Sequence, residues 1–105
     1  MARSQSLSGG DKARLLRAFA FHIHRKEPAE DVLRTHIEEQ LRAGRRREYL
    51  PVEAALNESG FAAALKAMTV IGEETAVILA AVVDAKDHRL LAACLNDLAD
   101  FVEGM

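Results

Sequence analysis

The side chains in this 105-residue sequence that could do chemistry are four histidines, one cysteine and a few clustered charges. His22 and His24 are two positions apart, so on a helix they point about 200° away from each other and cannot ligate one metal ion. His36 and His88 belong to other segments, and no cysteine or carboxylate completes a recognised metal-binding spacing. We therefore predict no metal site and no cofactor.

A phosphotransfer role for His22 or His24 stays open, because the basic residues 25 and 26 beside them could hold a phosphoryl group. The cysteine, Cys94, lies on the apolar stripe of an expected helix, which is typical of a buried structural thiol. Glu73 and Glu74 are adjacent at a helix start, where the positive end of the helix dipole favours them, and adjacent positions do not converge as catalytic pairs do. With no phosphate-binding loop or nucleophile elbow, we predict that the chain is not an enzyme.

Basic residues cluster around the middle of the chain. Residues 1–50 carry a balance of +4 and residues 51–105 a balance of −6, which gives the net charge of −2. The cluster Arg45-Arg46-Arg47 could hold phosphates, so a small regulatory protein that associates with nucleic acid is one alternative. Glu48 follows the cluster directly, and no aromatic residues interleave for base stacking. The charge asymmetry also suits docking to a partner or to another copy of the chain.

The elements that must position these residues are helices. Nineteen alanines and thirteen leucines stand against no tryptophan and few β-branched residues, which favours helix over sheet. Apolar spacing, glycines and prolines predict a flexible leader over residues 1–10 and one domain over 11–105. The expected helices lie near residues 11–27, 28–44, 51–57, 61–71, 73–85 and 88–103. Gly44 is expected to end the second helix and Asp87 to cap the last one.

Residues 76–83 form the longest apolar run and predict the central, buried helix of the domain. A buried strand at Val77-Ile78-Leu79 is the rival interpretation. Eight residues are far short of the roughly 20 that span a bilayer, so we expect no transmembrane segment. One cysteine and no signal peptide indicate a cytoplasmic protein. The fold class is therefore predicted as all-α, a single antiparallel bundle of five or six helices, and any apolar surplus is ascribed to self-association.

Several blocks of the sequence resemble a known domain. They are Leu41-Arg42-Ala43-Gly44, Val52-Glu53-Ala54-Ala55-Leu56, Gly72-Glu73-Glu74-Thr75 and the ending Leu98-Ala99-Asp100-Phe101-Val102-Glu103, with Phe61 and Met68 between them. Their order over about residues 33–103 is similar to the cytoplasmic helical domain of the platform proteins of type II secretion and type IV pilus machines. The membrane helices of that family are not among the residues of this chain.

The resemblance implies a bacterial, non-catalytic assembly module at the inner face of the membrane that docks an assembly ATPase or another inner-membrane component. The apolar surplus and the charge asymmetry separately predict a homo-oligomer. We place the predicted partner-binding residues on the basic connector and on the acidic helix start. They are Arg42, Arg45, Arg46, Arg47, Glu73 and Glu74.

Overall fold

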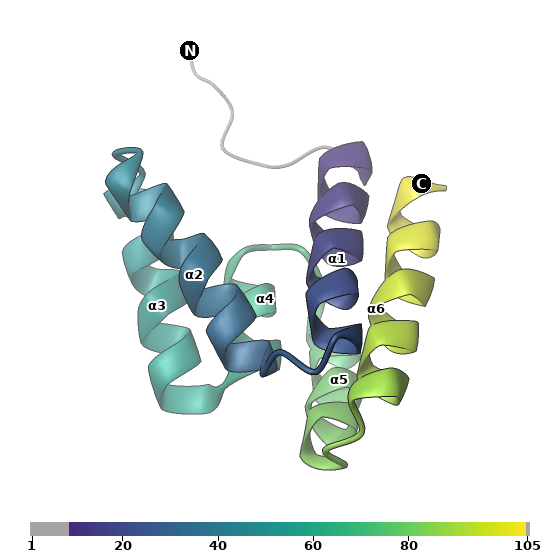
Figure 1. The fold of residues 1–105 in the computed structure, drawn as a ribbon. Coiled ribbons are helices and arrows are strands. Elements are labelled where there is room, and N and C mark those ends of the chain that lie inside the picture. The colour runs from purple at the N-terminus through teal and green to yellow at the C-terminus, as the bar shows by residue number, and fades with distance from the viewer. Residues whose placement is uncertain (1–8, 105) are drawn as a thin grey trace.

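The computed structural model describes residues 9–104, and within that range every regular element is a helix (Figure 1). The helices are α1 (Gly9–His24), α2 (Ala29–Arg42), α3 (Arg46–Ser59), α4 (Phe61–Ala67), α5 (Glu73–Asp84) and α6 (His88–Glu103). The all-α prediction is confirmed, and the rival strand at residues 77–79 is wrong because these residues lie inside α5. None of the helices in this range combines the length and apolar character that a membrane span requires.

The first and last helices lie side by side and make the most extensive contact in the fold (Figure 1). Ala13, Leu16 and Ala20 of α1 and Leu95 and Ala99 of α6 are all buried, as their helical spacing predicts. A Cβ atom at Gly9 would lie 2.7 Å from the carbonyl oxygen of Val102, so glycine allows the two helices to approach closely there. The predicted leader therefore ends earlier than expected: Gly9 and Gly10 belong to α1, and residues 1–8 lie outside the described range.

A second pair, α2 and α3, is joined at Gly44, which has a φ of +91° as predicted for the end of α2. The amide of Gly44 donates to the Leu41 carbonyl and that of Arg45 to the Gln40 carbonyl. The expected start of the third helix at Pro51 is wrong, because α3 begins at Arg46 and contains the proline. The proline removes one backbone hydrogen bond from the helix. Tyr49, Val52 and Leu56 lie on one buried face, and their packing against the core extends the helix toward its start.

The short helix α4 is the enclosed element of the fold. Four of its seven residues are buried, among them Phe61 and Leu65, and α4 contacts α2, α3 and α5. The Phe61 ring packs edge-on against Phe19 of α1, with centroids 6.3 Å apart, and Phe19 packs in the same way against His36 of α2 at 5.6 Å. The predicted helix over 61–71 is shorter than expected because Thr69 adopts a φ of +60°, which ends it.

The prediction that residues 76–83 form the central buried helix is wrong. In α5 the single buried residue is Leu79, and α5 contacts α4 and α6 but neither α2 nor α3. The pattern misleads because apolar residues surround this helix on all sides, so periodicity cannot tell which side faces the core. The α4–α5 connection, in which Val70 and Ile71 are buried, places α5 at the surface.

Candidate functional site

The outer side of α5 is an exposed apolar surface. The Val77 side chain is 68% exposed and that of Ile78 is 63% exposed, whereas Leu79 between them and the core is fully buried. Ala80 and Ala81 are exposed as well. Exposure of two large adjacent β-branched side chains to water is unfavourable because of the hydrophobic effect. The small side chains of the neighbouring alanines leave room for another helix to approach. This side of α5 is therefore the first element of a candidate interaction site.

The neighbouring helix α6 also exposes large apolar side chains. Leu90 is 49% exposed and Phe101 67% exposed, and the two lie eleven residues apart, three helical turns along one side of α6. Phe101 lines a shallow pocket of about 500 Å³ together with Gly72, Glu73 and Thr75, so it lies next to the start of α5. We define Val77, Ile78, Ala81, Leu90 and Phe101 as the apolar face.

Cys94 lies on α6 between Leu90 and Phe101 and is half-buried. Desolvation raises the pKa of its thiol, and the negative charge of Asp97 raises it further. The predicted burial of this thiol is therefore only partial, and its structural role stays a prediction.

The predicted acidic pair borders the apolar face. Glu73 and Glu74 are exposed in the first turn of α5, and the Glu73 carboxylate accepts a hydrogen bond from the Lys66 ammonium at 3.1 Å. From Glu73 to Glu103 the chain carries seven carboxylates and two basic side chains, Lys86 and Arg89. Carboxylates therefore outnumber basic side chains on the two helices that carry the apolar face.

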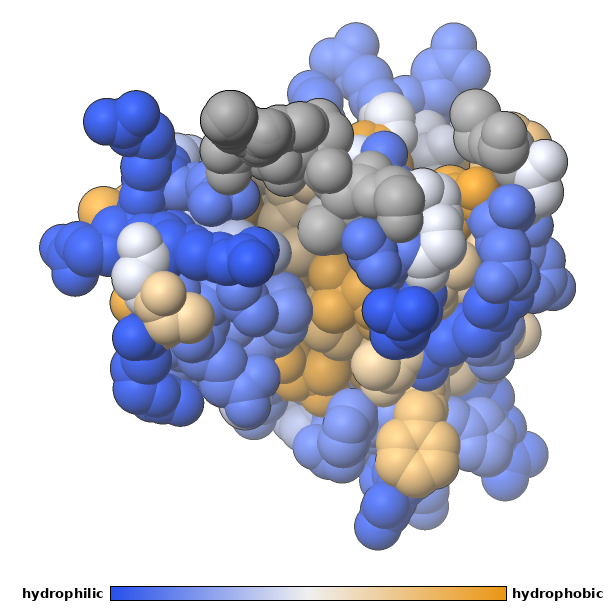
Figure 2. Space-filling view, turned by 90° about the horizontal axis from the view of Figure 1, so that it is seen from above, coloured by the Kyte–Doolittle hydropathy of each residue, from blue (hydrophilic) through white to orange (hydrophobic). Residues whose placement is uncertain are grey.

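The predicted basic residues occupy another part of the molecule. Arg42 ends α2, Arg45 lies in the turn, and Arg46 and Arg47 open α3, all with exposed side chains. Figure 2 shows hydrophilic side chains projecting around this end of the α2–α3 pair, with apolar surface in the hollow beside it. Because α5 touches neither α2 nor α3, the structure does not bring the arginines together with Glu73 and Glu74.

The histidines are dispersed, and within residues 9–104 no three His, Cys, Asp or Glu side chains gather as metal ligands. His22 and His24 are exposed, and Nδ1 of His22 lies 2.8 Å from the Glu27 carboxylate. His36 is half-buried between the rings of Phe19 and Tyr49. Desolvation lowers the pKa of His36, and the nearby Arg45 charge lowers it further against the opposing effect of Glu39.

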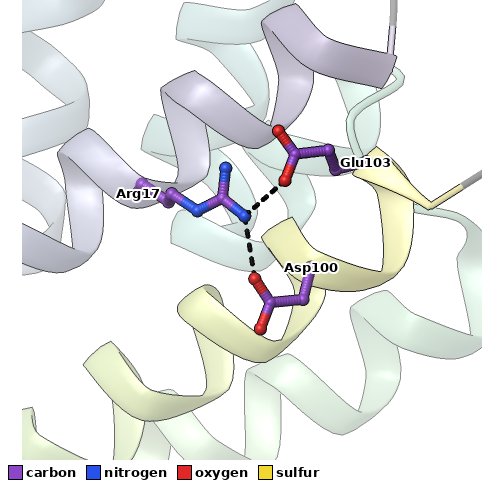
Figure 3. A network of polar contacts seen from close by, with 3 residues as sticks. All are labelled: Arg17, Asp100 and Glu103. Atoms are coloured by element: carbon purple, nitrogen blue, oxygen red, sulfur yellow. Dashed lines mark hydrogen bonds and ion pairs between the residues drawn. The ribbon is translucent and has the colours of Figure 1, made fainter.

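One polar network was missed by the sequence interpretation. Nη2 of Arg17 on α1 donates to Asp100 and to Glu103 on α6, at 2.8 Å each (Figure 3). Hydrogen bonding and the charge of Arg17 hold the pKa of the Glu103 carboxyl below its usual range. The two acids are three residues apart, which places them on one side of α6 and was the available signal. They join α6 to α1, whereas Phe101 between them points into solvent.

Comparison of the chain with protein-family models, with curated proteins and with solved structures finds no match in any of the three.

Proposed function

We propose that this protein is a non-catalytic interaction and assembly module that binds a protein partner through the apolar face on α5 and α6. The observation that carries this proposal is the exposure of Val77 and Ile78, two-thirds of whose side chains lie in water beside a fully buried Leu79. Contiguous exposed apolar side chains, when bordered by polar residues, mark interaction sites in soluble proteins.

The partner that fits this face is an amphipathic helix with basic residues along its edges. The apolar residues of α5 recur at i, i+1 and i+4, which is the spacing that an apposed helix can cover, and Ala81 permits close approach. Glu74, which is exposed at the start of α5, would meet the basic residues of that helix.

The resemblance to the helical domain of secretion and pilus platform proteins supplies a specific form of this proposal. In that form the partner is an assembly ATPase or another component of an inner-membrane machine, and the protein acts in the cytoplasm at the inner face of the membrane. The finer architecture, one antiparallel bundle, belongs to the same proposal and is supported by the extensive contact between α1 and α6. The competing proposal is a homo-oligomer, in which the apolar face of a second copy of the chain covers this face.

Affinity capture followed by mass spectrometry tests this proposal when it is run with matched variants. We expect a protein recovered by the wild type to be lost with Ile78→Asp and retained with Ala54→Asp, which places the same charge on an exposed position of α3. With the purified partner, Glu74→Lys should weaken binding while Glu58→Lys, an exposed control on α3, should not. Equal effects of the paired variants contradict the proposed face, and doubling of the solution mass of the free chain assigns the face to a second copy.

A second candidate function is nucleic-acid association through Arg45, Arg46 and Arg47. It is favoured by the exposure of all three guanidinium groups at one turn, where they can reach phosphates. A gel shift that weakens steeply with salt and disappears when the three arginines are neutralised supports this function. Absence of binding at low salt excludes it.

A further inference from the structure

A basic groove runs between α1 and α6. It has a volume of about 550 Å³, and small side chains, Ala20, Ala92 and Ala93, form part of its lining. The remaining lining residues are Arg17, Phe21, His24, Arg25, Arg89 and Asn96. Leu90 and Phe101 lie about 100° around α6 from Arg89, Ala93 and Asn96, and neither lines the groove, so this groove is separate from the apolar face.

The groove is lined by three arginines and one histidine and by no carboxylate. Within residues 9–104 neither Arg25 nor Arg89 forms an ion pair, so their guanidinium groups are available to an anion. Arg17 differs, because Asp100 and Glu103 both accept from it (Figure 3). The attraction for an anion is therefore concentrated at Arg25 and Arg89, and the two carboxylates repel anions at the Arg17 end.

The groove also contains an exposed aromatic ring. Phe21 is 58% exposed, and the guanidinium carbon of Arg25 lies 5.4 Å from the centre of its ring. A cation over an exposed ring is held by a modest attraction, so a ligand can displace it. The ring face that Arg25 covers can stack against a planar group of a ligand. The displaced guanidinium group then stays beside the ring and can bind an anionic group of the same ligand.

We propose that this groove binds a mononucleotide, with its phosphate on Arg25 and Arg89 and its base stacked on Phe21. Arginine forks match phosphate oxygens in two parallel hydrogen bonds, and bases stack on aromatic side chains without sequence preference. The volume suits a single small ligand. A longer strand fits less well, because its next phosphate toward Arg17 would meet Asp100 and Glu103.

Amide NMR titration of the full chain with AMP, adenosine, ribose 5-phosphate and inorganic phosphate tests this inference. We expect AMP to shift signals of residues 17–25 and 89–96 and to bind more tightly than the other three probes. Arg89→Gln should weaken AMP binding about tenfold, the effect of losing one charge-assisted hydrogen bond. Phe21→Ala should weaken binding of AMP but leave that of inorganic phosphate unchanged, since only the base contacts the ring.

The matched control is Arg34→Gln, which removes an arginine of α2 that does not line the groove and should leave AMP binding unchanged. Far-UV circular dichroism of each variant verifies that it folds. The inference is overturned if a 10-fold excess of AMP over millimolar protein shifts no signals in the two segments. It is also overturned if Arg34→Gln weakens AMP binding as much as Arg89→Gln does. Tighter binding of a thymidine oligonucleotide than of AMP overturns it in favour of single-stranded nucleic acid.

Discussion

Adjacent residues of α5 should differ sharply in their contribution to stability. Leu79 is fully buried, so Leu79→Ala removes a core side chain and should lower the free energy of unfolding by about 3 kcal/mol. Ile78 is 63% exposed, so only about a third of its side chain is buried, and Ile78→Ala removes only that buried part. That third is worth about 0.7 kcal/mol of burial, and the higher helix propensity of alanine returns about 0.4 kcal/mol. The net cost of Ile78→Ala is therefore about 0.3 kcal/mol.

Urea unfolding followed by circular dichroism measures both values. At a slope of about 1 kcal/mol per molar urea, the midpoint should fall by about 3 M for Leu79→Ala and about 0.3 M for Ile78→Ala. A cost above about 1.5 kcal/mol for Ile78→Ala would refute the surface position of this side chain, because that value requires burial. Repeating the measurement at several protein concentrations separates burial within one chain from burial against a second copy, since dimer stability depends on concentration.

Three further predictions concern the helix ends and one titrating side chain. Thr69→Gly should raise the free energy of unfolding by about 1 kcal/mol, because a β-branched residue is strained at a φ of +60°. Asp87→Ala should lower it by about 1 kcal/mol, since the carboxylate accepts from the amides of Arg89 and Leu90, whereas Asp87→Asn should retain most of the cap. Because the pKa of His36 is lower in the folded chain, the unfolded chain binds more protons, and stability should fall as pH drops below about 6.5. Urea midpoints between pH 7.5 and 5 measure this slope, which His36→Gln should reduce; an unchanged slope in that variant contradicts the assignment.

Much of the fold could be predicted from local signals. Gly44 and Asp87 mark helix ends because each makes a local interaction that its residue type specifies, a positive φ in one case and two accepted hydrogen bonds in the other. The stripes of α1 and α6 follow from helical spacing. The start of α3 and the end of α4 could not be placed, because packing of Tyr49 outweighs the proline and a strained Thr69 replaces the usual glycine.

The position of α5 shows where sequence patterns stop being informative. An all-round apolar helix has no preferred side, so its place depends on the α4–α5 connection and on the pairing of α1 with α6. The candidate site was consequently predicted only at its border, through Glu73 and Glu74. Val77 and Ile78 were instead predicted to lie in the core, as part of the apolar run over residues 76–83.

The most direct measurement is a map of amide chemical shifts in the labelled chain as it binds the partner that capture recovers. We expect the shifted signals to lie in residues 74–84 and 90–101, which contain the apolar face and its acidic border. Shifts confined to residues 42–48, the arginine-rich turn, would contradict the claim that α5 and α6 form the interaction surface.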